Sequence, residues 1–259
     1  MNGRALYVDP ALYSRVFPPD AGEAAFFTAL LKAVPPGAAV LDAGCGTASL
    51  AAMLPLQVVG LDRCRELLRA APAPVQTVEA DLTALPFRKG TLGGAFSRLF
   101  GYGYALGEVP GWAAAIAEEL GRVLRPGAPV ALEVPLAHRP SRLQGIEERA
   151  VLPGGLAYRF RYLDVLEETA FGTVLATRIE VRDPAGEEWH LAAPLHVYTP
   201  EGARAWLAHA GITEVRFHAP YDLASGTAEP PEDCLRAVAV GVHQRKSVRI
   251  MLPAQRAIT

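Results

Sequence analysis

The chain has 259 residues, 51% of them hydrophobic and 20% charged, so it can bury a sizeable core as one large domain or as one domain with an insertion. This composition excludes an intrinsically disordered chain. The formal net charge of −2 gives no global attraction to nucleic acid or to an anionic membrane.

Cysteine usage and hydropathy exclude further classes. Cys45, Cys64 and Cys234 are widely spaced and form no C-x-x-C pair, so we predict neither a disulfide framework nor a metal site. No apolar stretch reaches about 18 residues, and the N-terminus is not followed by an apolar signal segment. We therefore expect a cytoplasmic protein without a membrane span.

The first 20 residues are predicted to form an irregular arm. Tyr13 is one of its aromatic side chains, which either cover a pocket or pack on the outside of the core. Asp20 is a typical N-cap for a helix to about Val34, because a carboxylate can accept from the free backbone N–H groups of the first turn. Pro35-Pro36-Gly37 would end that helix.

Apolar runs and helical segments then alternate up to Pro135, which predicts right-handed βαβ units and a mostly parallel sheet. The first expected strand begins at Val40. Four more strands are expected over residues 57–62, 75–79, 92–97 and 129–134. The expected helices cover residues 47–54, 63–70 and 112–124.

The pattern changes after Pro135. Residues 136–155 are expected to form a loop with some helical character, and residues 156–162, 173–181 and 187–191 are expected to form strands without an intervening helix. This is typical of an antiparallel insertion. A helix over residues 199–210 and strands over 212–217 and 234–242 would return to the first sheet. The predicted parts are therefore an arm and core over 1–135, an insertion over 136–198, a return to the core over 199–243 and a tail over 244–259.

The first strand ends in an acid and two glycines, Asp42, Gly44 and Gly46. This order predicts a buried strand, a tight turn and a helix N-terminus, where a ligand can contact backbone N–H groups. A carboxylate beside the turn would repel a pyrophosphate but would suit a cationic ligand. Ser49 also departs from the dinucleotide fingerprint, and no Gly-Lys-Ser/Thr follows, so a P-loop is excluded.

Two further acids end the next two strands. Asp62 follows Asp42 by 20 residues (62 − 42) and could accept from both hydroxyls of a ribose. Asp81 ends the third strand and could accept from an exocyclic amine. A ligand with a cationic end, a ribose, an aminated base and no phosphate fits S-adenosylmethionine.

Four segments in register resemble class I S-adenosylmethionine-dependent methyltransferases. They are Leu41–Thr47, similar to motif I, Val59–Asp62, Glu79–Phe87 and Glu119–Gly127. The resemblance implies an α/β fold with a Rossmann-like seven-stranded mostly parallel sheet, helices on both faces and an antiparallel β lid insertion. It implies S-adenosyl-L-methionine as cofactor and these cofactor-binding residues: Asp42, Ala43, Gly44, Gly46, Asp62, Arg63, Asp81, Leu82 and Ser97. The family often has a third glycine where Ala48 stands, and alanine fits there if its φ stays negative.

The insertion and the segment His196-Val197-Tyr198-Thr199-Pro200 resemble small-molecule methyltransferases of the glycine/sarcosine and aminosugar type. Leu99-Phe100-Gly101-Tyr102 is similar to a segment that follows their fourth strand. Relatives often have arginine where His196 stands, and a histidine clamps a carboxylate only when it is charged, so the substrate stays open.

Methyl transfer by in-line displacement, as the resemblance implies, requires chiefly that nucleophile and methyl are positioned. A neutral amine needs no base, whereas a hydroxyl usually does, and His138 and His196 are the candidate bases. Tyr13 and Tyr102 are candidate cation–π contacts, or they belong to the core. Arg159 and Arg161 share one face of a strand, which is either solvated or a pocket for an anionic substrate.

The leading hypothesis is an enzyme that methylates the N or O of a small molecule as a monomer or homodimer, without nucleic acid or membrane as partner. A nucleic-acid methyltransferase is disfavoured by the near-neutral charge and by Ser97-Arg98-Leu99-Phe100, which stands where Asn/Asp-Pro-Pro-Tyr is expected. A non-catalytic protein that binds S-adenosylmethionine remains the third hypothesis, because the three acids predict binding and not turnover.

Overall fold

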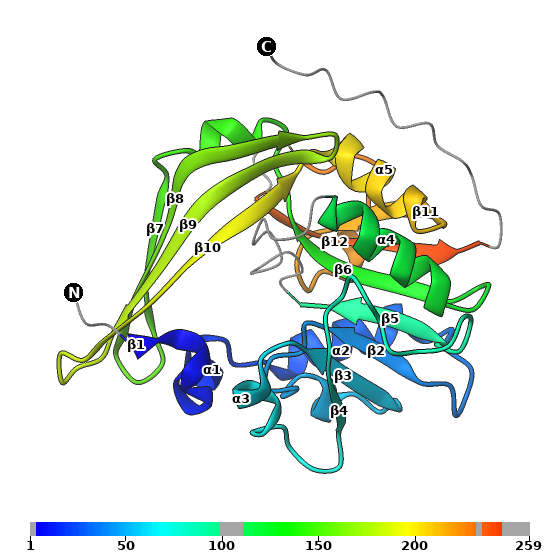
Figure 1. Ribbon diagram of the computed structural model, residues 1–259, viewed down its shortest axis with the longest axis horizontal. Coiled ribbons are helices and arrows are strands. Elements are labelled where there is room, and N and C mark those ends of the chain that lie inside the picture. Colours follow the sequence, from blue (N-terminus) through cyan, green and yellow to red (C-terminus); the bar gives the residue numbers. More distant parts are fainter. Residues whose placement is uncertain (1–3, 99–110, 232–234, 245–259) are drawn as a thin grey trace.

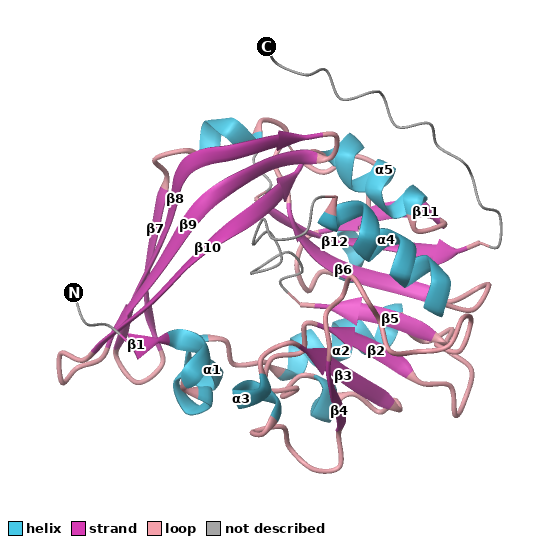
Figure 2. Cartoon of the chain, in the orientation of Figure 1, coloured by secondary structure: helices cyan, strands magenta, loops and turns pink. Residues whose placement is uncertain are grey.

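The computed structural model describes residues 4–98, 111–231 and 235–244, which form two β-sheets with helices around them (Figures 1 and 2). The larger sheet has seven strands in the order β11-β12-β6-β5-β2-β3-β4. Strands β2 to β6 run parallel, and β12 is antiparallel to both of its neighbours. The bounds are β2 (Val40–Ala43), β3 (Val58–Asp62), β4 (Gln76–Glu79), β5 (Gly94–Ser97), β6 (Pro129–Pro135), β11 (Ile212–His218) and β12 (Arg236–His243).

This sheet confirms the predicted fold class. The chain runs from β2 outward to β4 and then returns to the other side of β2 as β5, so the strand order reverses between β2 and β5 (Figure 1). In open α/β sheets, ligands bind outside the carboxyl ends of the strands at such a switch point. The carboxyl ends of β2 and β5 carry Asp42 and Ser97.

Helices cover both faces of the larger sheet. The bounds are α2 (Ala21–Leu30), α3 (Arg65–Leu68), α4 (Trp112–Val123) and α5 (Pro200–His209), with a short 3₁₀ turn η4 (Leu223–Ser225) before β12. Helix α2 packs Phe26 and Phe27 against Phe96 on one face. Helices α4 and α5 pack Ile116 and Trp206 in a second apolar cluster on the other face.

Asp20 caps α2 as predicted. Its Oδ1 accepts from the Glu23 backbone N–H at 2.8 Å, and Glu23 Oε2 accepts from the Asp20 N–H at 3.3 Å, which is a reciprocal capping box. The helix ends at Leu30, four residues before the predicted Val34.

Two predicted crossover helices are much shorter in the structure. Residues 47–54 form turns and a 3₁₀ turn, η2 (Ala51–Met53), and residues 63–70 contain only the four-residue helix α3. Ala48 has a φ of 53°, in the left-handed region, so the right-handed helix cannot begin at Thr47. Pro55 follows Leu54 and disfavours a helical conformation there.

Residues 4–16 of the N-terminal arm form regular elements, so the prediction of an irregular segment was wrong there. The arm contains β1 (Arg4–Ala5), the 3₁₀ turn η1 (Leu6–Val8) and α1 (Pro10–Val16). Asp9 caps α1, because its Oδ1 accepts from the Leu12 N–H at 2.9 Å, and Pro10 stands at the first helical position.

The lid insertion supplies four antiparallel strands, and β1 of the arm pairs parallel with β10 to complete a five-stranded sheet in the order β1-β10-β9-β8-β7. The bounds are η3 (Pro140–Leu143), β7 (Glu147–Leu152), β8 (Leu156–Thr169), β9 (Gly172–Arg182) and β10 (Glu188–Tyr198). The predicted hairpins are confirmed, but β7 lies where a loop was expected. Within the described part of the chain, no helix is long and apolar enough to cross a membrane.

One face of the lid sheet packs on the arm. Phe160 and Ile179 share a buried apolar cluster with Leu12 and Val16 of α1. The arm is therefore held by the lid on one side, while its other contacts reach the larger sheet.

Candidate functional site

The turn after β2 is built from left-handed residues. Gly44 has a φ of 75° and Gly46 a φ of 56°, conformations that glycine adopts without strain. Ala48 also has a positive φ and is fully buried, so the condition under which alanine fits there without strain is not met. The Ala48 N–H donates to the Cys45 carbonyl at 2.8 Å, which closes the turn and fixes alanine in a strained conformation.

Parallel pairing of β2 and β3 brings the predicted acids together. Asp42 is 3% exposed, and burial raises its pKa to about 8, with the nearby charge of Asp62 as a second cause. Burial also raises the pKa of Asp62, although backbone N–H groups oppose this effect. The carboxyl of Asp62 accepts from the Gly46 N–H at 2.9 Å and from the Cys64 N–H at 2.8 Å, so it ties the turns after β2 and β3 together.

The remaining predicted cofactor residues lie along the same edge of the sheet. Asp81 follows β4, and its Oδ1 accepts from the Thr83 N–H at 2.8 Å and the Thr83 hydroxyl at 2.7 Å. Arg63 is exposed beside Asp62, whose pKa its charge lowers, and Leu82 is fully buried. The buried Ser97 hydroxyl donates to the Ala43 carbonyl, which joins the ends of β5 and β2.

The arm lies directly on this turn. A Cβ on Gly46 would stand 2.7 Å from the Tyr13 hydroxyl, and the Ser14 and Thr47 hydroxyls are 3.3 Å apart. Burial raises the pKa of Tyr13 well above its usual value. Of the two alternatives for the aromatic arm, the structure shows it lying over the turn after β2.

Between arm and turn there is a cavity of about 30 Å³. It is lined by Tyr13, Phe17, Pro19, Asp42, Gly44, Cys45, Thr47, Ser49, Leu50 and Arg98. This volume is far below the roughly 300–1,000 Å³ of a small-molecule pocket, because the Tyr13 ring lies against the turn. The Tyr13 ring therefore leaves little room beside the turn in this structure.

Arg98 was not among the predicted site residues, but it holds the arm. Its guanidinium donates to the Phe17 carbonyl at 2.9 Å and the Pro18 carbonyl at 3.1 Å, and its Nε pairs with the buried Glu23 at 2.7 Å. The one sequence feature that could have identified Arg98 is its position directly after Ser97, at the switch point of the sheet. These partners lie about 80 positions earlier in the chain, so the sequence around Arg98 could not identify them.

The two candidate bases lie apart from this cavity. His138 is exposed, and its Nε2 is 3.3 Å from the Pro230 carbonyl. His196 is fully buried on β10, with Nε2 2.8 Å from the Thr169 hydroxyl. Burial lowers the pKa of His196 to about 4, so the imidazole is neutral at neutral pH. Its ring packs edge-on against Trp112 and Tyr198.

The candidate substrate residues do not lie together in the structure. Tyr13 lies at the cavity, whereas Tyr102 lies outside the described residues. Arg159 and Arg161 lie together on β8, where both pair with Glu180. They share the face opposite to Phe160, the residue that packs on the arm, so they point away from the cavity.

The seven-stranded sheet, with its acid-lined turn at the switch point, has the Rossmann-like fold of solved methyltransferase structures. Residues 41–132 match the family described as methyltransferase domain. No curated protein matches the sequence significantly.

Solved structures of the same architecture cover nearly the whole chain. The CcbJ methyltransferase from Streptomyces caelestis is 16% identical, with a TM-score of 0.68 over 93% of this chain and 98% of that one. The sugar N-methyltransferase KedS8 from Streptoalloteichus is 20% identical, with a TM-score of 0.64 over 94% and 96%. CalS10, an amino pentose methyltransferase from Micromonospora echinaspora, is 22% identical, with a TM-score of 0.60 over 89% and 94%. Residues 41–132 thus match a methyltransferase domain, and the chain shares the fold of these methyltransferase structures.

Proposed function

We propose that the protein transfers a methyl group from S-adenosylmethionine to a nitrogen of a small molecule. The observation that carries the proposal is the set of acids at the switch point, where Asp42 and Asp62 meet the turn after β2. This set suits a ligand with a cationic end and a ribose and disfavours one with a phosphate.

The residues present fit the cofactor chemically. The buried Asp42 carboxyl has a raised pKa, so a cationic group beside it would stabilise the charged form. Asp62 and Asp81 each have an oxygen with further acceptor capacity for hydroxyl and amine donors. In this assignment Asp42 holds the cationic end, Asp62 the ribose and Asp81 the adenine amine, with backbone from Ala43 to Gly46 along the turn.

Methyl transfer to an amine requires little acid–base catalysis by the protein. The sulfonium of the cofactor activates the methyl group, and the chain has to align the acceptor with it and exclude water. The arm covers the turn, with Tyr13 against Gly46. A covered turn suits a small acceptor better than a polymer.

The choice of nitrogen over oxygen follows from the histidines. The described residues that line the cavity include no histidine, and the imidazole of His196 is a poor base because its pKa is about 4. A hydroxyl acceptor would need a base within hydrogen-bond reach, whereas an amine that arrives neutral would not. The similarity to sugar and amino pentose methyltransferases supports an amine on a small polar molecule such as an amino sugar.

Incubation with methyl-labelled cofactor and a panel of amino sugars, alkyl amines, phenols and hydroxy acids tests the proposal. We expect label in the amines alone. Label in phenols or hydroxy acids alone would replace nitrogen by oxygen as the acceptor. Transfer to RNA alone would overturn the small-molecule assignment, and tight cofactor binding without any transfer would indicate a binding protein.

A further inference from the structure

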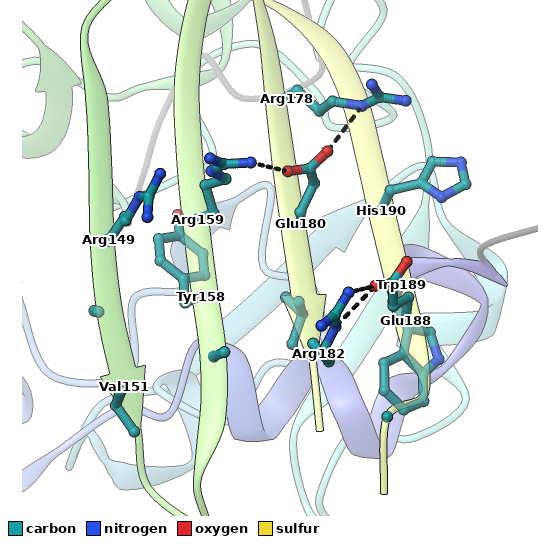
Figure 3. Close-up of a pocket in the computed structure, with 14 residues that line it drawn as sticks. Arg149, Val151, Tyr158, Arg159, Arg178, Glu180, Arg182, Glu188, Trp189 and His190 are labelled. Atoms are coloured by element: carbon teal, nitrogen blue, oxygen red, sulfur yellow. Dashed lines mark hydrogen bonds and ion pairs between the residues drawn. The ribbon is translucent and has the colours of Figure 1, made fainter. Parts of the chain in front are cut away.

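The lid sheet carries a cluster of charged side chains on the face that points away from α1, which we name the arginine face. It consists of Arg149, Arg159, Arg161, Arg178, Arg182, Glu147, Glu180 and Glu188. A cavity of about 1020 Å³ lies over this part of the sheet (Figure 3). The proposed function makes no use of it.

The strand register places like charges directly opposite each other. Arg149 of β7 faces Arg159 of β8, and Arg161 of β8 faces Arg178 of β9. Directly opposed like charges destabilise a sheet. On its other side each of the two β8 arginines faces an acid, Glu180 for Arg159 and Glu147 for Arg161. The two like-charged pairs still bring four guanidinium groups close together on one face.

The acids on this face do not balance the arginines. Glu147 pairs with Arg149 and with Arg159, the latter at 3.0 Å. Glu180 is shared by Arg159, Arg161 and Arg178, and only Arg182 has an acid to itself, Glu188. Five guanidinium groups thus share three carboxylates, and the arginine face keeps an excess of two positive charges.

Hydrogen-bond donors are in surplus as well. Each guanidinium has five N–H donors, and one carboxylate offers about four acceptor positions. The Nε atoms of Arg161 and Arg178 are buried without a hydrogen-bond partner. Figure 3 shows Arg159 and Arg178 both directed at Glu180, with Arg149 on the neighbouring strand.

We propose that the arginine face binds a small ligand that carries at least two phosphate groups, at a site separate from the methyl-transfer site. Planar guanidinium forks match phosphate oxygens in pairs, and opposed arginines can hold one phosphate from both sides. The cavity is as large as pockets for small molecules, which reach roughly 1,000 Å³. The lid sheet and α1 lie between this site and the turn after β2, so the ligand is not the bound cofactor.

Calorimetric titration of inorganic diphosphate into the full chain tests this proposal. We expect saturable binding that weakens as salt is raised, because the contacts are ionic. The double variant Arg159→Gln/Arg178→Gln is expected to bind diphosphate at least about tenfold more weakly, with cofactor affinity unchanged. Arg88→Gln, which removes an exposed arginine from the other sheet's side of the molecule, is the matched control and is expected to bind like the wild type.

A second variant works in the opposite direction and does not depend on the fold tolerating the loss of arginines. Glu180→Gln removes the carboxylate that competes for three guanidiniums, so it is expected to tighten diphosphate binding. Absence of saturable binding, or equal affinity in all variants, would overturn the site. Tighter binding of glutarate or of an acidic peptide than of diphosphate would overturn the phosphate assignment.

Discussion

Arg98 and Glu23 form a buried ion pair of 2.7 Å beneath the N-terminal arm. The same guanidinium donates to the backbone carbonyls of Phe17 and Pro18, so one side chain joins the end of β5, helix α2 and the arm. Since the arm covers the turn after β2, the exchange of ligands at that turn depends on this group.

Replacing Arg98 by lysine tests the hydrogen bonds to the arm separately from the ion pair with Glu23. Arg98→Lys keeps a positive charge beside the buried Glu23 carboxylate but cannot reproduce the planar fork on two carbonyls. We expect amide hydrogens of α1 to exchange roughly tenfold faster, because two hydrogen bonds of about 1 kcal/mol each are weakened. Hydrogen exchange measured by mass spectrometry reports this, with the exposed Arg69→Lys as control. Unchanged exchange in α1 would show that the arm is held without Arg98.

Asp62 is expected to govern cofactor affinity. Asp62→Asn keeps the shape of the side chain but removes the charge that would accept from the ribose hydroxyls, a loss of about 1.5–3 kcal/mol. Calorimetry should therefore give at least tenfold weaker binding of S-adenosylmethionine. Glu118→Gln removes an exposed acid from α4 and should leave affinity unaltered. Equal affinity in Asp62→Asn and wild type would sink the assignment.

Cofactor binding should depend on pH through Asp42. Its pKa is about 8 in the free protein because of burial and the charge of Asp62, so the carboxyl is mostly protonated at neutral pH. A cationic group beside it lowers that pKa, and binding then releases a proton. Affinity should rise with pH by up to about tenfold per unit below pH 8 and then level off.

Titrations in buffers of different ionisation enthalpy count the proton released. Asp42→Asn cannot release it and corrects for any titration of the cofactor itself. The same slope in variant and wild type would contradict the role of Asp42.

His196 should make the fold sensitive to acid. Its folded pKa of about 4 lies below the usual 6.5 because burial disfavours the charged ring. The unfolded chain therefore binds the proton first, and the contribution is fully present above pH 6.5 and lost as pH falls towards 4. Its size is about 3 kcal/mol at most.

Urea unfolding between pH 7 and pH 4 measures this loss of stability. His196→Gln can still hydrogen-bond Thr169 but does not titrate, so its unfolding free energy should fall less over this range. His209→Gln, on the surface of α5, should keep the full dependence. Parallel curves for wild type and His196→Gln would assign the acid sensitivity elsewhere.

The core of the fold was predictable because buried parallel strands are continuous apolar runs that end in recognisable turns. The apolar runs before Asp42 and Asp62 correctly predicted β2 and β3. The parallel pairing of these strands brings the two acids together. Strand β7 was missed because its residues are mostly exposed, so the sequence from Glu147 to Leu152 shows no alternation of buried and exposed positions.

Features set by distant contacts were not predictable. The left-handed φ of Ala48 is imposed by the turn that its N–H closes, since alanine itself disfavours that conformation. The lowered pKa of His196 is caused by its burial, to which Trp112, far from it in sequence, contributes a ring contact. Arg159 and Arg161 were correctly placed on one face, but only the packing of Phe160 on the arm shows which face that is.

The arm contacts both sheets. Arg4 and Ala5 pair with Trp189 and His190 at the edge of the lid, and eight residues after Ala5 the Tyr13 ring rests on Gly46. Displacing Tyr13 from the turn therefore pulls on the edge of β10, and a shift of the lid pulls on the covering of the turn. In the proposed function, one short stretch of chain thus connects the turn that would take the methyl donor to the edge of the lid.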